Sequence, residues 1–207
     1  AIVPVHLFGQ TADMDAIMAI AKEHNLYVIE DNCQAVGADH TSANGTKKKS
    51  GTIGHIGTTS FFPSKNLGCY GDGGALFTND DDIAKKLRRV CNHGSDVRYY
   101  HEVVGVNSRL DSMQAAILRV KLRHLDEYAA ARNAAAAQYD KAFAGISELV
   151  TPQRDARTTH VFHQYTMRVL GGHRDALKAH LEKNNVPAMI YYPVPCHLQN
   201  AYKSDRF

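Results

Sequence analysis

Apolar and polar positions along the first part of the chain follow a strand, helix, strand order. Residues 1–7 form a short apolar run, and Gly9 marks the turn that follows it. Residues 13–24 place apolar side chains at helical spacing behind Asp13, a residue type that caps helix N-termini. Residues 26–31 form a second apolar run. This order predicts a β-α-β unit, so the sheet should be at least partly parallel.

The middle of the chain predicts two further strands and a helix. Residues 53–62 and 74–78 are apolar runs on either side of a glycine-rich loop. Residues 79–82 are Asn-Asp-Asp-Asp, and they precede a helical pattern from Ile83 to about Val90. Acidic residues stabilise the N-terminal end of a helix, so a helix is expected to begin there.

The longest periodic segment is residues 110–144, which predicts a helix that Asp111 can cap. A helix of this length commonly bridges two lobes, and we interpret its apolar stripe as core packing rather than as a cofactor surface. The stripe comprises Met113, Ala116, Ile117, Val120, Leu122 and Leu125.

The pattern changes after Pro152, where a small α+β lobe is expected. Its expected elements are a strand at 162–169, a helix at 174–184 and a strand at 186–192. We therefore predict two domains: residues 1–148 as part of a large domain that ends in the bridging helix, and residues 149–207 as part of a small C-terminal domain.

Composition bounds the class of protein. The 207 residues are 44% hydrophobic and 22% charged, as in a globular protein without a membrane-length apolar run. The net charge of +3 is weak, and Lys47–Lys49 is interpreted as a solvated loop, too short to indicate nucleic-acid binding. Four cysteines without paired spacing favour free thiols, and with no visible signal peptide we expect a cytoplasmic protein. His160 and His163 lack partners at ligand spacing, so no metal site is expected.

The candidate chemistry centres on residues 58–75. An apolar strand stops at Pro63, and Lys65 follows within a run of small residues and glycines. One interpretation is an amine held in a closely packed pocket, where it is nucleophilic towards a carbonyl group. The other is an ordinary loop lysine beside a hairpin.

An acidic pair upstream bears on this choice. Glu30 and Asp31 end a buried-type strand, and open α/β sheets bind their ligands at such strand ends. Pyridoxal phosphate requires a lysine, a carboxylate for the pyridinium nitrogen, a phosphate cradle and contacts to the ring hydroxyl. Asp31 and Lys65 are of the required types on successive strand ends, although spacing alone does not decide between the two interpretations.

Four segments together resemble the sugar aminotransferases of the DegT/DnrJ/EryC1/StrS family, in the family's own order. They are Glu30–Ala35, Ser60–Gly68, Gly105–Asp111 and, for the C-terminal substrate motif, Tyr191–His197. The resemblance implies an α/β fold of the aspartate-aminotransferase type (fold type I) with pyridoxal 5'-phosphate as cofactor. It also implies that the chain begins inside what the family has as a middle strand and stops before the family's last elements.

The resemblance assigns the cofactor residues. Lys65 corresponds to the Schiff-base lysine that also moves the proton between cofactor and substrate carbons, and Asp31 to the partner of the pyridinium nitrogen. Gln34 is expected to stack beside the ring or reach its hydroxyl, and Ser60 to bind the phosphate. Asn107 is expected to contact the cofactor phosphate of a neighbouring subunit, which implies a homodimer with shared sites. The alternatives are a helix N-cap for Asp31 and a surface amide for Gln34.

The resemblance also suggests substrate residues. Arg109 is expected to contact the sugar nucleotide or a carboxylate on it; otherwise it is an interface ion-pair residue. Tyr191, Tyr192 and His197 lie in a stiff, proline-punctuated segment that the family places over the sugar, and the alternative is aromatic packing between lobes. His6 is interpreted as structural, because a histidine without partners is more often so. Glu30 is not assigned to the site.

The implied function is transfer of an amino group from glutamate to a nucleotide-linked keto-sugar, in amino-sugar biosynthesis for surface polysaccharide. The segment 61–74 is most similar to the branch that aminates C3 of a UDP-linked N-acetylglucuronate derivative. Sugar dehydratases of the same fold carry histidine at the lysine position, so Lys65 disfavours that activity. Two alternatives remain: a regulatory or sensory relative that binds the cofactor without turnover, and a fragment that binds no cofactor.

Overall fold

The computed structural model describes residues 1–203, and the chain divides into two compact units. The first comprises Ala1–Ala142 and Gln153–Tyr165, and the second comprises Phe143–Pro152 and Thr166–Phe207, as far as it is described. The expected division at residues 148/149 differs from this, because residues 153–165 return to the first unit. Backbone hydrogen bonds hold them there, from Thr159 N to Asp39 O (3.0 Å) and from Val161 N to Gly9 O (2.9 Å). That the units belong to a large and a small domain stays a prediction.

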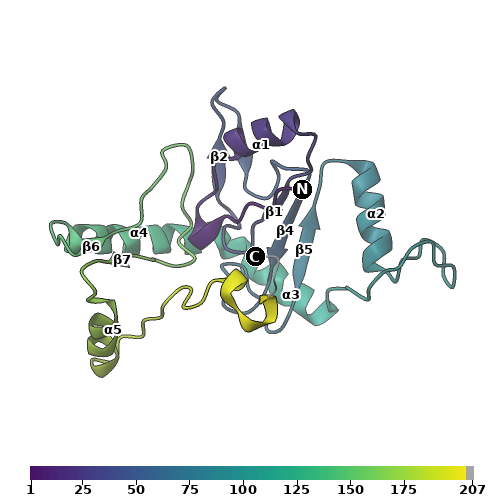
Figure 1. The fold of residues 1–207 in the computed structure, drawn as a ribbon. Helices are drawn as coiled ribbons and strands as arrows, with labels where there is room; N and C mark the ends of the chain where they lie inside the picture. Colours follow the sequence, from purple (N-terminus) through teal and green to yellow (C-terminus); the bar gives the residue numbers. More distant parts are fainter. Residues whose placement is uncertain (204–207) are drawn as a thin grey trace. The chain divides into compact units, whose positions relative to one another are not determined.

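A mixed sheet forms the centre of the first unit (Figure 1). Its strands, in spatial order, are β1 (Ile29–Asp31), β4 (Ile56–Ser60) and β5 (Gly74–Phe77). β1 runs parallel to β4 with Asp31 opposite Thr58, and β5 runs antiparallel to β4 with Gly74 opposite Ser60. Isolated parallel bridges place residues 2–5 beside β1, where a full strand was expected. The prediction of a partly parallel sheet is confirmed.

Three helices of the first unit begin at acidic caps in the expected segments. The helices of this unit are η1 (Leu7–Gly9), α1 (Met14–Glu23), α2 (Asp81–Cys91), α3 (Ser112–Lys121), η2 (Leu122–His124) and α4 (Leu125–Phe143). Asp13, Asp80 and Asp111 each accept a hydrogen bond from a first-turn amide of α1, α2 and α3. These carboxylates satisfy amide donors that have no partner within the helix, which explains why the helices begin there.

The prediction of a single long helix at 110–144 is wrong, because the tight turn η2 separates α3 from α4. Leu122 keeps helical backbone angles (φ −58°, ψ −31°), so a tightened turn rather than a helix-breaking residue divides the segment. The interpretation of the stripe as core also fails in part. Leu125 is buried, but Met113 is 72% exposed and Val120 is 58% exposed within this chain.

The basic run Lys47–Lys49 is strand β3 rather than a loop. It pairs antiparallel with β2 (Asp39–Thr41), and the ammonium groups of Lys47 and Lys49 lie 3.0 and 2.9 Å from the Asp39 carboxylate. All three lysines are exposed, as expected. The hairpin forms because a tight turn ending at Gly45 (φ +83°) brings the two short strands together.

Two apolar clusters fix the elements around the candidate chemistry. Met14, Ala21 and Val28 join α1 to the sheet. The second cluster joins the glycine-rich segment after Lys65 to α3 and α4; it comprises Leu67, Cys69, Leu118 and Leu125. Burial of these side chains stabilises the position of the loop that carries Lys65.

The second unit is small. Its elements are β6 (Leu149–Val150), β7 (Arg168–Val169), α5 (Arg174–Lys183), η3 (Cys196–Leu198) and η4 (Asn200–Tyr202). β6 and β7 pair antiparallel, and the expected helix at 174–184 is confirmed. The expected strand at 162–169 is wrong except at its end, because Phe162 has a left-handed φ of +44°. No strand forms at 186–192, since no described segment pairs with it there.

Candidate functional site

The parallel pairing of β1 and β4 brings Asp31 and Ser60 to the same edge of the sheet. Each ends its strand, and the chain turns immediately after Ser60. In that turn Lys65 N donates to Phe62 O (2.9 Å), and Phe61 N donates to Gly73 O (2.7 Å). The carboxylate, the hydroxyl and the amine expected to act together are therefore all carried by this edge.

The thiol of Cys33 reports how close the acid and the amine lie. Burial raises the pKa of Cys33 to about 11, and the hydrogen bond and charge of Asp31 add to that increase, while the charge of Lys65 opposes it. Cys33 N also donates to Asp31 Oδ1 (3.1 Å). The structure thus places Asp31 and Lys65, which are distant in sequence, around one half-buried thiol.

Asn66, directly after the lysine, anchors the turn. Its side chain is 7% exposed; Nδ2 donates to Val161 O (3.2 Å), and Oδ1 lies 3.1 Å from His163 Nδ1. Arg132 of α4 donates in turn to His163 O (3.2 Å). Burial lowers the pKa of His163 to about 4, and the charges of Lys65 and Arg132 contribute, so the imidazole is neutral at pH 7 and donates from Nδ1. Sequence reasoning missed this anchor, although Asn66 lies within the lysine motif.

Gln34 and Ser60 occupy defined positions near this edge. Gln34 is buried, and its Oε1 accepts a hydrogen bond from Phe8 N (2.6 Å), so it is not a surface amide. Ser60 is half-buried, and its Oγ accepts from Phe62 N (3.2 Å). Their expected contacts with a cofactor stay predictions.

Asn107 and Arg109 lie on the exposed loop between α2 and α3. Arg109 Nε donates to Asn107 Oδ1 (3.0 Å), so the two side chains form a local pair. Both line a groove of about 950 Å³, together with β5 and α2 residues such as Leu76 and Arg88. Within residues 1–203, no hydrogen bond joins this pair to the Lys65 turn.

The expected substrate residues of the C-terminal motif belong to the second unit. The rings of Tyr191 and Tyr192 meet edge to face with centroids 5.3 Å apart, and Tyr191 Oη lies 3.6 Å from Met189 Sδ. His197 is exposed in η3. Their roles as substrate contacts stay predictions.

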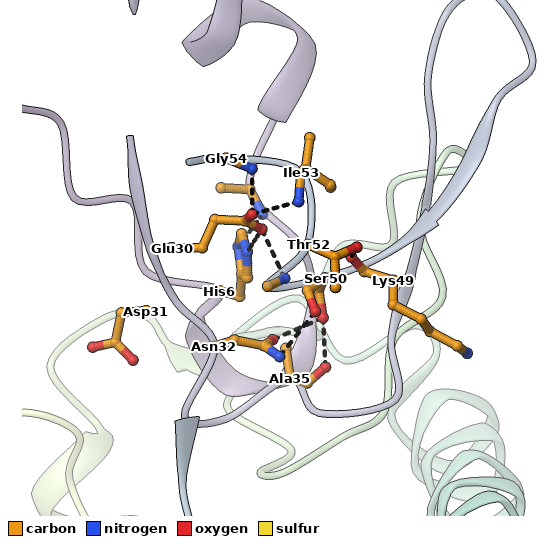
Figure 2. Close-up of polar contacts among 12 residues, drawn as sticks. His6, Glu30, Asp31, Asn32, Ala35, Lys49, Ser50, Thr52, Ile53 and Gly54 are labelled. Carbon is orange, nitrogen blue, oxygen red and sulfur yellow. Dashed lines mark hydrogen bonds and ion pairs between the residues drawn. The ribbon is translucent and has the colours of Figure 1, made fainter. Parts of the chain in front are cut away.

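A buried pair that the sequence left unassigned lies beside Asp31. His6 Nε2 is 2.8 Å from Glu30 Oε2, and both side chains are fully buried. Figure 2 shows Glu30 directed towards His6 and the loop 51–54, with the Asp31 carboxylate pointing away from them. The structural interpretation of His6 fits this contact.

Two further searches covered the described part of the chain. Residues 1–203 contain no group of three or more His, Cys, Asp or Glu side chains arranged to hold a metal ion. Over the same residues, no helix combines the length and the apolar character needed to cross a bilayer.

Comparison with known proteins gives consistent matches along the whole chain. The family model described as the DegT/DnrJ/EryC1/StrS aminotransferase family matches residues 1–206. A pleiotropic regulatory protein from Geobacillus stearothermophilus is 52% identical, over 99% of this chain and 54% of the relative. The UDP-2-acetamido-2-deoxy-3-oxo-D-glucuronate aminotransferase of Pseudomonas aeruginosa is 45% identical, over 100% of this chain and 55% of the relative.

The solved structures agree with this. The crystal structure of S. venezuelae DesV in complex with a ketimine intermediate is 43% identical, with a TM-score of 0.89 over 97% of this chain and 52% of that chain. The fold is therefore the α/β fold of type I, as expected. The chain spans about half the length of the curated relatives it matches.

Proposed function

Because the chain belongs to the DegT/DnrJ/EryC1/StrS aminotransferase family, we propose that it forms part of a pyridoxal-phosphate-dependent enzyme that aminates a nucleotide-linked keto-sugar. The family's aminotransferases depend on this cofactor. The observation that carries the proposal is the convergence of Asp31 and Lys65 on Cys33 at the carboxyl edge of β1 and β4. We further propose glutamate as the amino donor.

The donor set at this edge fits pyridoxal phosphate. Lys65 offers a primary amine, Asp31 a carboxylate for the ring nitrogen, and Ser60 a hydroxyl for a phosphate oxygen. Gln34, held by Phe8 N, supplies a buried amide for the ring. When bound, the cofactor supplies an electron sink for the substrate carbon.

The roles of the protein groups follow from their chemistry. The amine of Lys65 removes the proton from the Cα atom of the amino donor and returns a proton to the sugar carbon that receives nitrogen. Arginine cannot do this, because its guanidinium group stays protonated. The carboxylate of Asp31 would accept a hydrogen bond from the ring nitrogen of a bound cofactor, and the buried surroundings of Asn66 keep the Lys65 turn in place.

We also propose a homodimer in which the Asn107–Arg109 loop completes the site of a second copy. The preceding part of the same loop, residues 97–106, exposes large apolar side chains that a second copy would bury. They are Val97, Tyr99, Tyr100, Val104 and Val106. Asn107 would then contact the partner's cofactor phosphate, and Arg109 a carboxylate on the sugar. Tyr191, Tyr192 and His197 would contact the sugar itself.

The finer assignment is a UDP-linked 3-oxo-glucuronate derivative as substrate, in cytoplasmic synthesis of surface polysaccharide. The name of the Pseudomonas aeruginosa relative supports this branch. A second candidate function is regulation without turnover, which the name of the 52% identical relative favours. The two candidate functions differ in one observable: an aminotransferase converts its bound pyridoxal phosphate when glutamate is added, whereas a regulatory protein without turnover leaves it unchanged.

An absorbance titration tests the proposal. Added pyridoxal phosphate should produce a visible absorbance band in the protein, and glutamate should remove it. A band that glutamate leaves unchanged favours regulation. Lys65→Ala and Lys65→Arg should abolish the band, whereas Lys48→Ala, an exposed lysine of β3, should retain it. Absence of a band both in the 207-residue chain and in a chain of its relatives' length would refute the cofactor assignment.

A further inference from the structure

We propose that Glu30 and His6 are positioning residues that fix Asp31 for the ring nitrogen of the cofactor, an inference that rests on the proposed function. The Glu30 side chain points to the face opposite Asp31, since successive side chains of a strand point to opposite faces, and it contacts His6 there. Figure 2 shows Asp31 directed away from the Glu30 carboxylate. Glu30 would therefore act through the backbone of β1.

The Glu30 carboxylate ties the end of β1 to the loop 51–54. Oε1 accepts hydrogen bonds from Ile53 N (2.6 Å) and Gly54 N (2.5 Å), and Oε2 accepts from Gly51 N (2.7 Å) and His6 Nε2 (2.8 Å). Burial alone would raise the pKa of Glu30, but these donors outweigh it and lower the pKa overall. A fully buried carboxylate with four donors is ionised and held in one orientation.

His6 links this carboxylate to the backbone of Asp31. Its Nδ1 accepts a hydrogen bond from Ala12 N (3.1 Å), so the ring proton lies on Nε2, where it is donated to Glu30. The backbone of the same segment pairs with Asp31 on both sides: His6 N donates to Asp31 O (3.0 Å), and Asp31 N donates to Pro4 O (2.9 Å). Side chain and backbone thus fix the same strand end.

The loop is fixed to the residue after Asp31 as well. Ser50 Oγ donates to Asn32 Oδ1 (2.7 Å), and Asn32 Nδ2 donates to Ser50 O (3.0 Å) (Figure 2). Asn32 N also donates to Thr58 O of β4 (2.9 Å). Asp31 therefore lies between two residues, Glu30 and Asn32, that are both bonded to the segment 50–54.

This arrangement predicts that Glu30→Gln cannot be accommodated. The new amide would place an N–H group against either Ile53 N and Gly54 N or Gly51 N and His6 Nε2, and all four are donors. His6 cannot relieve the conflict by moving its proton to Nδ1, because Ala12 N–H already points at that atom. The loop and the strand end must separate, and Asp31 moves with them.

A cofactor-independent test uses Cys33 as the reporter. Cys91 and Cys196 are first replaced by serine, because they are half-buried and exposed, whereas Cys69 is buried. Asp31 raises the pKa of Cys33, so its displacement in Glu30→Gln should lower that pKa. The rate of reaction with a disulfide reagent at pH 8 should rise at least about threefold, and its pH profile should shift to lower pH.

The matched control is Asp15→Asn. Asp15 Oδ1 pairs with His40 Nε2 (3.3 Å), a second buried histidine with a carboxylate partner. Within residues 1–203, no hydrogen bond or ion pair joins Asp15 to Asp31. This variant should leave the pH profile of Cys33 unchanged, and continued protection of Cys69 shows that each variant is folded. His6→Leu, which removes both the donor towards Glu30 and the acceptor for Ala12 N, should shift the Cys33 profile in the same direction and provides a second variant if Glu30→Gln does not fold.

The cofactor arm separates this inference from the proposed function. Glu30→Gln should raise the Kd for pyridoxal phosphate about tenfold or more, whereas Asp15→Asn should bind the cofactor with the Kd of the wild type. Failure of the wild type to bind the cofactor, both as the 207-residue chain and in a chain of its relatives' length, refutes the proposed function, and the Cys33 profile still tests the positioning. An unchanged Cys33 profile in a folded Glu30→Gln variant or, if that variant does not fold, in His6→Leu overturns the inference.

Discussion

The hydrogen bonds of Asn66 allow a quantitative prediction for Asn66→Ala. The side chain is 7% exposed and makes two hydrogen bonds, to Val161 O and His163 Nδ1. Each bond contributes about 1 kcal/mol, and a partner left buried without a replacement costs about 1–3 kcal/mol. The free energy of unfolding should therefore fall by about 2–4 kcal/mol. Because the Lys65 turn loses its anchor, the affinity for pyridoxal phosphate should fall as well.

Asn133→Ala is the matched control. Asn133 Nδ2 donates to Ala129 O (2.9 Å) and His160 O (2.8 Å), so this variant also loses two bonds near the same segment, but not at the lysine turn. Urea unfolding followed by circular dichroism gives the stabilities, and absorbance titration gives the cofactor affinity. Loss of less than about 0.5 kcal/mol in Asn66→Ala, or an equal loss of affinity in both variants, would refute the reasoning.

Three further predictions follow from burial, close contact and exposure. Burial lowers the pKa of both His160 and His163 from 6.5 to about 4. Between these pH values the unfolded chain binds more protons than the folded chain, so the free energy of unfolding should fall as the pH decreases from about 6.5 to about 4. Replacing both histidines with glutamine should make the urea midpoint depend less on pH over that range. An unchanged dependence on pH contradicts the assignment of this effect to His160 and His163. In Gly57→Ala the new Cβ would lie 1.9 Å from Gly51 O, so the free energy of unfolding should fall by about 3 kcal/mol or more. Urea unfolding measures this loss, and the control is Gly71→Ala, whose new Cβ meets only a flexible side chain. Val104 is 98% exposed, so if it lies in a dimer interface, Val104→Asp should shift sedimentation towards the monomer; identical sedimentation of a dimeric wild type and the variant would exclude it from that interface.

The local pattern was sufficient for the elements whose boundaries depend on neighbouring residues. Asp13, Asp80 and Asp111 were recognisable as helix caps, because a carboxylate before an apolar helical pattern satisfies amides within the same turn. The parallel bridging of residues 2–5 to the segment of β1 followed from the strand, helix, strand order. Asp31 and Lys65 were recognisable from motifs that resemble those of the family; Asp31 ends β1, and Lys65 lies in the turn that follows β4.

Only the tertiary structure decided the contacts between distant segments. Phe162 was expected in a strand because its neighbours alternate, yet its left-handed backbone belongs to a segment that returns to the first unit. Lys47–Lys49 was expected in a loop, and antiparallel backbone pairing with β2 makes it a strand. In both cases the deciding partner lies far away or across a turn, outside the window in which periodicity operates.

The same distinction holds for the candidate site. The sequence by itself determined which chemical groups it contains: the amine of Lys65, the carboxylate of Asp31 and the hydroxyl of Ser60. The tertiary structure decided what holds them, through His6 and Glu30 beside Asp31 and through His163 and Asn66 beside Lys65. A functional group is a property of one residue, whereas its orientation depends on hydrogen bonds and burial that exist only after remote segments have packed together.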